Sequence, residues 1–269
     1  MKDLFVDLFN KKPLEIINND YYFNSDSDGD QFDETDADLW LNKGIFKSNW
    51  ERAAQKDNVF NDMYSDILNV VSKKPSPFLE IACGPAMGLT PVILSKYPQL
   101  PCLVSDACSL LIKSWRKYIN VELKQYDINL ASFSVMDMPM KSNCLDMVTS
   151  SLGVSSTRAG EQGEMQALSE IFRVLKNGGY FIAIENEWTD FDAIEKVFAL
   201  WGRPVWSGIR KEKTWQEKFL ECGFNIESCD KTYFRYLRKN DNDLGEQADK
   251  FGIKIGTKFT LFILRKPSE

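Results

Sequence analysis

The sequence predicts an α/β protein with a doubly wound, mostly parallel sheet of seven strands and an antiparallel pair at the C-terminal end. Two observations predict this fold. From Phe78 onward, short apolar runs alternate with helical patterns, which is typical of βαβ units. Near the end of the chain, residues 224–237 and 258–266 are two strand-like runs separated by a polar loop. A pair of this kind is typical of antiparallel strands that close a sheet edge.

A helix is expected before the first strand, because apolar residues between Val59 and Val71 recur on one helical face and Pro75 ends the pattern. Asp57 or Asn58 would begin this helix. The order along the chain then predicts strands near 78–83, 102–106, 131–137, 145–152 and 179–186. Helices are expected near 88–97, 107–119, 162–176, 187–200 and 214–222, the third of them ended by the sequence KNGG.

Residues 1–56 are polar and aromatic and differ in composition from the rest of the chain. We expect them to form an N-terminal helical cap or lid, dispensable for folding of the sheet. Residues 57–269 would form the main domain, with an aromatic-rich insertion near 187–215.

The acidic stretch from Asn24 to Asp38 partly resembles a calcium loop, with Asn24, Asp26 and Asp28 at alternate positions and Gly29 at the sixth. Thr35 stands at the twelfth position, where such a loop needs a bidentate glutamate. A solvated acidic loop is therefore favoured, and no metal site is predicted.

Composition narrows the functional classes. The formal net charge is -6, which argues against nucleic acid and anionic membranes as partners. No apolar run reaches the roughly 18 residues of a membrane span, so we expect a soluble, cytoplasmic protein. The 6 cysteines include no Cys-x-x-Cys pair, which favours reduced thiols. The chain has no histidine, so any general base must be another group.

The stretch FLEIACGPAMGLT, residues 78–90, runs from a strand through small residues into a helix, which is typical of a loop that holds a nucleotide. No Gly-Lys-Ser/Thr follows, which excludes a phosphate-binding loop of the Walker type. Alignment with the nicotinamide motif G-x-G-x-x-G offers Ala82, Gly84 and Met87, and the bulky third residue argues against that class.

The pattern E-x-A-x-G-x-A-x-G from Glu80 to Gly88 instead resembles the class I S-adenosylmethionine-dependent methyltransferases, of the broad type 11 group, which have a Rossmann-like fold. Three further motifs carry the resemblance in order along the chain, over residues 75–187. They are CLVSDAC, which ends a strand at Asp106, SFSVMDMP around Asp137, and NCLDMVTSSLGV followed by ALSEIFRVLKNGGYFIAIEN.

The resemblance implies a role for each motif in binding S-adenosylmethionine, with S-adenosylhomocysteine as product. The glycine-rich loop would hold the methionine end, Asp106 would accept both ribose hydroxyls, Asp137 would receive the adenine amino group and Met138 would pack on the ring. The implied cofactor residues are Glu80, Ala82, Cys83, Gly84, Pro85, Ala86, Asp106, Ala107, Asp137, Met138 and Ser150.

Each of these residues also has a structural explanation. Glu80 and Asp106 could cap the helices that follow them, Asp137 could belong to a turn, and Met138 could fill the core. The ordered coincidence of the motifs favours the cofactor role. Ala82 and Ala86 depart from the family pattern, because both positions are usually glycine and alanine tolerates positive φ poorly.

Methyl transfer needs a base only when the acceptor arrives protonated. Candidate bases are Glu185, Glu187 and Asp190, with tyrosines as weaker options, and these acids could equally cap the helix near 187–200. Aromatic residues concentrate in the two additions, and Trp40 and Trp188 are candidate substrate contacts.

No Asn/Asp-Pro-Pro-Tyr motif or Pro-Cys nucleophile pair follows the expected strands, which argues against methylation of DNA. The sequence therefore favours methyl transfer to a small-molecule acceptor. A protein or nucleic-acid methyltransferase and a non-catalytic S-adenosylmethionine-binding protein remain the alternatives. The acceptor atom and the oligomeric state are not predicted.

Overall fold

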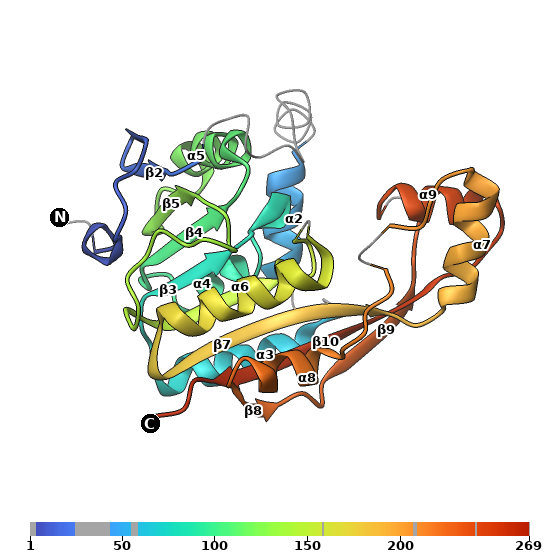
Figure 1. The fold of residues 1–269 in the computed structure, drawn as a ribbon. Coiled ribbons are helices and arrows are strands. Elements are labelled where there is room, and N and C mark those ends of the chain that lie inside the picture. Colours follow the sequence, from blue (N-terminus) through green and yellow to red (C-terminus); the bar gives the residue numbers. More distant parts are fainter. Residues whose placement is uncertain are drawn as a thin grey trace.

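The computed structural model describes residues 4–24, 44–54, 59–157, 159–206, 209–239 and 241–268. These residues form a mixed sheet of ten strands in the order β1-β2-β5-β4-β3-β6-β7-β10-β8, with β9 also paired to β10 (Figure 1). The predicted α/β class is confirmed, and the sheet has more strands than the seven expected.

Five parallel strands form the centre of the sheet. In chain order they are β3 (Phe78–Ile81), β4 (Cys102–Asp106), β5 (Ile128–Ser132), β6 (Leu145–Ser151) and β7 (Leu175–Trp188). The strand order reverses at β3, whose neighbours are β4 and β6. In open sheets of this type, ligands bind outside the carboxyl ends of the strands at such a reversal.

The C-terminal part closes the sheet with antiparallel strands, as predicted. One edge of β10 (Gly256–Arg265) pairs with β7 from Thr257 to Arg265. Its other edge pairs with β8 (Asn225–Ser228) and then β9 (Thr232–Tyr236), so the expected run 224–237 is two strands. The long strands β7, β9 and β10 continue beyond the central sheet as an arm that carries a small lobe (Figure 1).

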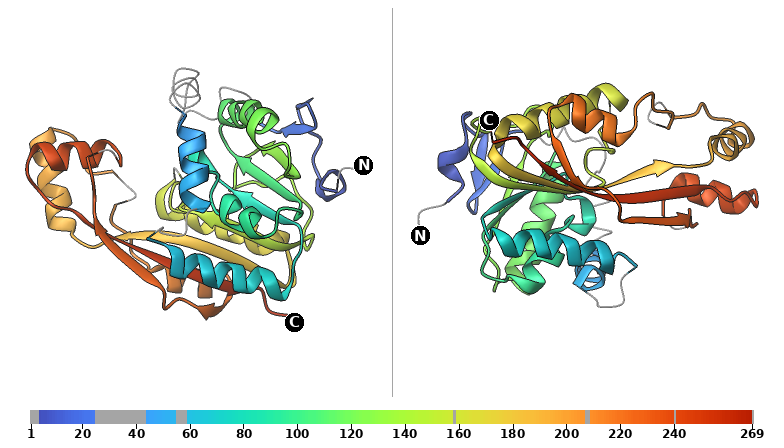
Figure 2. Two further views of the ribbon diagram at one scale, coloured as in Figure 1. Left: turned by 180° about the vertical axis from the view of Figure 1, so that it is seen from behind. Right: turned by 90° about the horizontal axis from the view of Figure 1, so that it is seen from below.

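Helices cover both faces of the sheet (Figure 2). On one face, α3 (Asn61–Lys73), α4 (Thr90–Lys96) and α5 (Ser109–Glu122) share an apolar cluster with the sheet. On the other, α6 (Gly160–Val174) and α8 (Trp215–Glu221) share a second cluster. A doubly wound sheet buries both of its faces in this way.

The lobe at the end of the arm holds α7 (Phe191–Trp201) and α9 (Asp243–Lys250), which pack around a small core of their own. The aromatic-rich insertion expected near 187–215 thus contributes α7 and the segment after it. Helix α9 lies in the stretch expected to be a polar loop. Its N-terminus is capped by Asn242, whose side chain accepts from the Gly245 amide at 2.9 Å.

Several predicted boundaries differ from the structure. Helix α3 begins at Asn61 and not at Asp57 or Asn58, and two further differences have a local cause. The strand expected at 131–137 is β5, which ends at Ser132, because the chain turns where the Asp137 amide donates to the Ser134 carbonyl. The helix expected to end at KNGG stops at Val174, and the two glycines lie inside β7. An irregularity in the pairing of β6 with β7 accommodates them.

The N-terminal segment is only partly helical. A short helical turn η1 (Val6–Leu8) precedes a hairpin of β1 (Glu15–Ile17) and β2 (Asp20–Tyr22). Strand β2 pairs in parallel with β5 and extends the sheet. The expected helical cap corresponds to α2 (Ile45–Ala54), which packs against α4 and the turn η2 (Gly84–Ala86).

Trp40 and almost all of the acidic stretch lie outside the described residues. In the described part of the chain, every helix is too short or too polar to cross a membrane.

Candidate functional site

The glycine-rich loop has an unusual backbone. Ala82, Gly84, Met87 and Gly88 have φ values of 46°, 54°, 60° and 56°. Positive φ is uncommon for residues other than glycine, and such strain clusters at functional sites. Ala82, expected to tolerate this conformation poorly, adopts it.

Asp106 joins the ends of two neighbouring strands. Its Oδ2 accepts from the Gly84 amide at 2.9 Å, and its Oδ1 accepts from the Cys108 amide at 2.9 Å. The side chain is almost buried, and burial raises the pKa of its carboxyl although the amides lower it. The predicted cofactor residues Gly84 and Asp106 are thus brought together at the carboxyl edge of the sheet.

Two side chains outside the predicted set hold the loop carbonyls. Trp115 Nε1 donates to the Gly84 carbonyl at 2.9 Å, and Asn49 Nδ2 donates to the Pro85 carbonyl at 2.7 Å. Phe46 of α2 stacks on Trp115 with ring centroids 4.0 Å apart. Sequence reasoning missed these residues, because only the folded chain brings α2 and α5 to the loop.

Glu80 is completely buried beneath the loop. Its Oε2 accepts from the Thr149 hydroxyl at 2.5 Å, whereas Oε1 has no partner of good hydrogen-bond geometry among the described residues. Burial raises the pKa of this carboxyl to about 8, against the lowering effects of the Thr149 hydroxyl and the Leu89 amide. Glu80 therefore supports the loop from below.

The other predicted cofactor residues lie in or near the glycine-rich loop. Cys83 is buried, and its amide donates to the Ser105 carbonyl at 2.9 Å. Ser150 is buried in β6 and accepts from the Gly153 amide at 3.1 Å. Pro85 and Ala86 are half-buried, and Ala107 is exposed.

Asp137 and Met138 are not brought to this loop. Asp137 follows β5 by five residues, is 71% exposed and forms an ion pair with Lys11 at 2.6 Å. Met138 is buried in the cluster under α6, and its amide donates to Glu170. The residues that directly follow β5 are Phe133 and Ser134.

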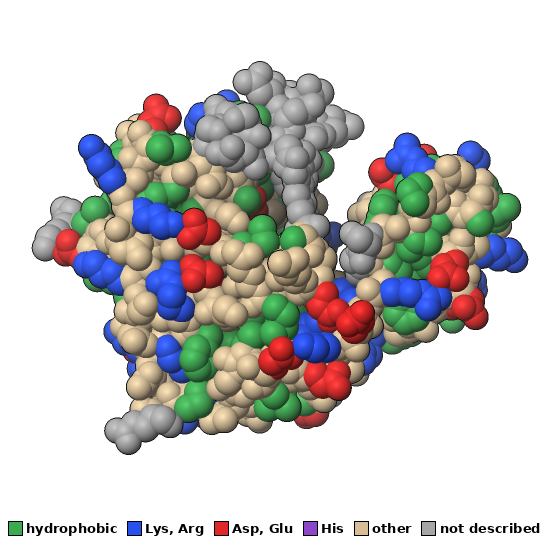
Figure 3. Space-filling view, in the orientation of Figure 1, with side chains coloured by type: hydrophobic (Ala, Val, Ile, Leu, Met, Phe, Trp, Pro, Cys, Tyr) green, Lys and Arg blue, Asp and Glu red, His purple; other side chains and the backbone are tan. Residues whose placement is uncertain are grey.

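A cavity of about 660 Å³ lies between the main body and the lobe, where the space-filling view shows the molecule hollowed (Figure 3). The loop after β6, the end of β7, the segment 209–215 and the lobe line it. Its aromatic walls are Trp188, Phe191, Trp206, Trp215 and Phe259.

Most of the charged side chains around this cavity are paired. Lys211 binds Glu164 and Arg235 binds Asp241. Lys213 binds Glu221 at 2.5 Å, and Lys258 binds Glu187 at 2.6 Å. Internal pairing leaves the aromatic cavity without a strong field of one sign.

The two predicted acids differ in position. Glu187 lines the cavity beside Trp188 and is 29% exposed. Glu185 is completely buried behind the cavity wall, where Val154 and Ser155 each donate a backbone amide to it at 3.2 Å. Burial raises the pKa of Glu185 to about 7, although Ser155, Val154 and the charge of Lys211 lower it.

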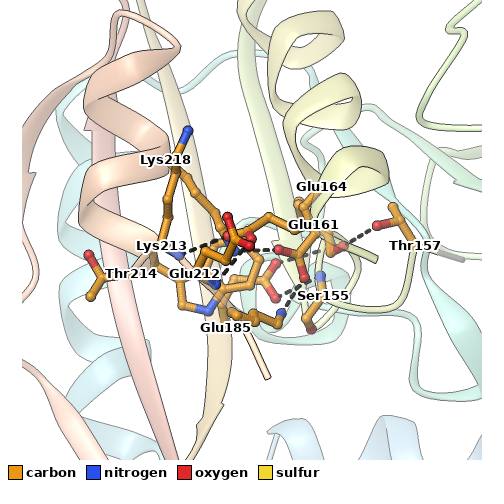
Figure 4. A network of polar contacts seen from close by, with 12 residues as sticks. Ser155, Thr157, Glu161, Glu164, Glu185, Glu212, Lys213, Thr214 and Lys218 are labelled. Carbon is orange, nitrogen blue, oxygen red and sulfur yellow. Dashed lines mark hydrogen bonds and ion pairs between the residues drawn. The ribbon is translucent and has the colours of Figure 1, made fainter. Parts of the chain in front are cut away.

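A buried ionic network fixes one wall of the cavity (Figure 4). Lys218 is completely buried and binds Glu164 at 2.6 Å and Glu161 at 2.9 Å. Glu161 also accepts the backbone amides of Glu212 and Lys213. The network thus ties the segment before α8 to α6.

Comparisons with known proteins indicate the family of the chain. The sequence model of the ubiE/COQ5 methyltransferase family matches residues 54–211. A demethylmenaquinone methyltransferase from Listeria monocytogenes is 24% identical over 193 residues, which covers 68% of this chain and 79% of that protein.

Two solved structures share the fold. The YcgJ protein from Bacillus subtilis is 13% identical, with a TM-score of 0.55, and the match covers 77% of this chain and 98% of that one. The [4+2]-cyclase SpnF is 12% identical, with a TM-score of 0.53, and the match covers 88% of this chain and 96% of that one.

Proposed function

The chain belongs to the ubiE/COQ5 methyltransferase family, and from this premise we propose that it transfers a methyl group from S-adenosylmethionine to a small molecule. The observation that carries the proposal is the bond between Asp106 and Gly84, which joins the ends of β4 and β3 where the strand order reverses. A nucleotide-binding site is expected at that place.

The residues at this place fit the cofactor. A Cβ at Gly84 would meet no atom within 4 Å, so one side of the loop is open to a ligand. The Asp106 carboxylate has acceptor capacity beyond the two amides it already binds. Asp106 would therefore hold the ribose, and the loop with Ala82, Gly84, Pro85 and Ala86 would hold the methionine end. Asp137 and Met138 would take part only if the loop after β5 were rearranged.

When bound, S-adenosylmethionine supplies an electrophilic methyl group and a good leaving group. The task of the chain is to orient the acceptor and exclude water. We assign the acceptor to the cavity beside Glu187 and Trp188, which adjoins the loop after β6. The aromatic walls and paired charges suit an uncharged, largely apolar molecule.

Glu185 is the better candidate for accepting a proton. A carboxyl with a pKa near the working pH suits general base catalysis. Ser155 lines the cavity and binds Glu185 through its backbone amide, whereas its hydroxyl donates to the Leu152 carbonyl at 3.1 Å. To pass a proton from the acceptor to Glu185, this hydroxyl would have to turn away from Leu152. The Glu187 carboxylate is held by Lys258 and would instead orient the acceptor.

The acceptor of the Listeria relative, demethylmenaquinone, is a reasonable first candidate, because the cavity can take an apolar ring. Protein and nucleic-acid acceptors are less well supported, since the cavity is lined by aromatic side chains. The likeness to a [4+2]-cyclase means that the fold alone does not specify the reaction.

Two measurements test the proposal. Calorimetry should detect binding of S-adenosylmethionine and S-adenosylhomocysteine to the wild type. Methyl-labelled S-adenosylmethionine should then label an acceptor in a panel of demethylquinols, other small metabolites, peptides and RNA. Binding without any labelling would favour a non-catalytic protein, and no binding would refute the proposal.

A further inference from the structure

Two asparagines of the N-terminal segment hold the loops on either side of Asp106. Asn24 Nδ2 donates to the Ala107 carbonyl at 3.1 Å, in the loop that follows β4. Asn49 Nδ2 donates to the Pro85 carbonyl at 2.7 Å, in the glycine-rich loop. Neither asparagine belongs to the motifs that indicate the cofactor site.

The sheet places Asn24 at this position. Strand β2 pairs in parallel with β5, and the next amide, that of Phe23, donates to the Ser132 carbonyl at 2.8 Å. Ser132 is in turn the pairing partner of Asp106 in β4. Because parallel strands end at the same edge of a sheet, Asn24 arrives beside the loop after Asp106.

A buried ion pair anchors the hairpin that carries Asn24. Asp20 is completely buried, and Arg116 of α5 donates to its carboxylate through Nε at 2.8 Å. The same guanidinium donates to the Ile128 carbonyl of β5 at 3.1 Å. Strand β2 is thus fixed to both α5 and β5, so Asn24 approaches from a rigid support.

The contact of Asn24 reaches Asp106 through one peptide group. In a planar trans peptide the carbonyl and the following N–H point in opposite directions. A donor on the Ala107 carbonyl therefore directs the Cys108 N–H toward Asp106 Oδ1, which accepts it at 2.9 Å. The other oxygen, Oδ2, accepts from Gly84, whose neighbour Pro85 is held by Asn49.

We propose that Asn24 and Asn49 are positioning residues that orient the Asp106 carboxylate for the ribose of the cofactor. The inference rests on the proposed function, because it takes Asp106 as the ribose acceptor. It gives the N-terminal segment a part in cofactor recognition as well as in covering the site. Both asparagines are half-buried, and the Asn49 contact is shorter than the Asn24 contact, 2.7 Å against 3.1 Å, so the contact of Asn49 should be the stronger.

The test compares two ligands, S-adenosylhomocysteine and its 2′-deoxy analogue, by calorimetry. The wild type should bind the first about tenfold more tightly, the change expected for one hydrogen bond to a charged acceptor. Asn49→Ala and Asn24→Ala should reduce this ratio of the two affinities about threefold, because each variant should bind only S-adenosylhomocysteine more weakly. A purely structural role would weaken both ligands equally.

Asn49→Asp sharpens the test, because it keeps the oxygen that accepts from Arg52 at 3.0 Å but loses the donor to Pro85. It should lower the ratio as Asn49→Ala does. Asn10→Ala and Lys47→Ala, at exposed positions of the same segment, serve as controls and should leave the ratio unchanged. Thermal denaturation checks that all variants fold.

The outcomes separate the two proposals. A wild type that binds neither ligand refutes the proposed cofactor, and this inference with it. A wild type that prefers S-adenosylhomocysteine, with the same preference in every asparagine variant, overturns this inference alone.

Discussion

The carboxylate of Glu80 occupies the space beside Gly88 in which any other residue would place its Cβ. A Cβ built on Gly88 would lie 1.7 Å from Glu80 Oε1 and 2.3 Å from its Cδ. Gly88 also has a φ of 56°, which side chains rarely adopt. The first and last residues of the E-x-A-x-G-x-A-x-G pattern are therefore a packing pair.

Gly88→Ala should strongly destabilise the fold, by about 3 kcal/mol or more, because clash and backbone strain add. Gly84→Ala is the matched control: its φ of 54° brings similar strain, but its Cβ would meet no atom within 4 Å. We expect the control to cost about 1–2 kcal/mol. Urea denaturation measures both, and adding Glu80→Ala should partly rescue Gly88→Ala. Equal losses at the two glycines would contradict the packing pair.

Glu80 should make the protein less stable as the pH rises. Between its ordinary pKa of 4.5 and its folded value of about 8, the folded carboxyl keeps a proton that the unfolded one has lost. Stability then falls with increasing pH, by at most about 1.4 kcal/mol per pH unit for one group. In Glu80→Gln this slope should become shallower across pH 5–8, whereas Glu227→Gln at an exposed position should keep it. Urea denaturation at several pH values measures the slopes, and identical slopes in all three proteins would disprove the assignment.

Glu185→Gln should remove the pH dependence of methyl transfer near neutrality. The carboxylate form accepts the proton, so wild-type activity should rise with pH through an apparent pKa of about 7. The charge of Lys211 lowers the pKa of Glu185, and Lys211 is itself paired with Glu164. We expect kcat/KM at neutral pH to fall about 100-fold in the variant, with unchanged affinity for S-adenosylhomocysteine. In Glu187→Gln the activity should still rise with pH as in the wild type. If the activity of Glu185→Gln also rises with pH in this way, Glu185 is not the base.

Lys218→Met should cost about 3–5 kcal/mol of stability, because it leaves Glu161 without its cation and the buried Glu164 with Lys211 alone. Lys218 is completely buried against Glu164, whereas the Lys213–Glu221 pair is about half exposed on each side. Lys213→Met should therefore change stability by less than about 1 kcal/mol. Combining Lys218→Met with Glu164→Gln should recover part of the loss. A small effect of Lys218→Met in urea denaturation would show that solvent reaches the network.

The central sheet was predictable because its strands are short apolar runs set between helical patterns. The motif around Gly84 and Asp106 was also predictable, since both lie next to strand ends and local sequence decides where a strand ends. The strand expected to end at Asp137 ends earlier, because the apolar residues after Ser132 resemble a strand although a turn begins at Ser134. Helix α9 was missed because its polar sequence offers only a short apolar face to the lobe.

Contacts between distant segments could not be read from local patterns. The stacking of Phe46 on Trp115 and the pairing of β2 with β5 join residues far apart in the chain. Neither segment carries a motif that names its partner. Composition therefore indicated a separate, helical cap, whereas the N-terminal segment supplies strands to the sheet and apolar groups to its core.

The last prediction follows from those apolar groups and concerns Phe46→Ala. Phe46 is completely buried and stacks on Trp115, whose Nε1 holds the Gly84 carbonyl. Removing the ring should cost about 3–5 kcal/mol of stability through the cavity it leaves. It should also weaken binding of S-adenosylhomocysteine, because Trp115 gains freedom to move away from the loop. Val121→Ala, on the same helix as Trp115 but 68% exposed, should affect neither property. A Phe46→Ala protein of wild-type stability would show instead that the N-terminal segment is a separable lid, as its composition alone suggested.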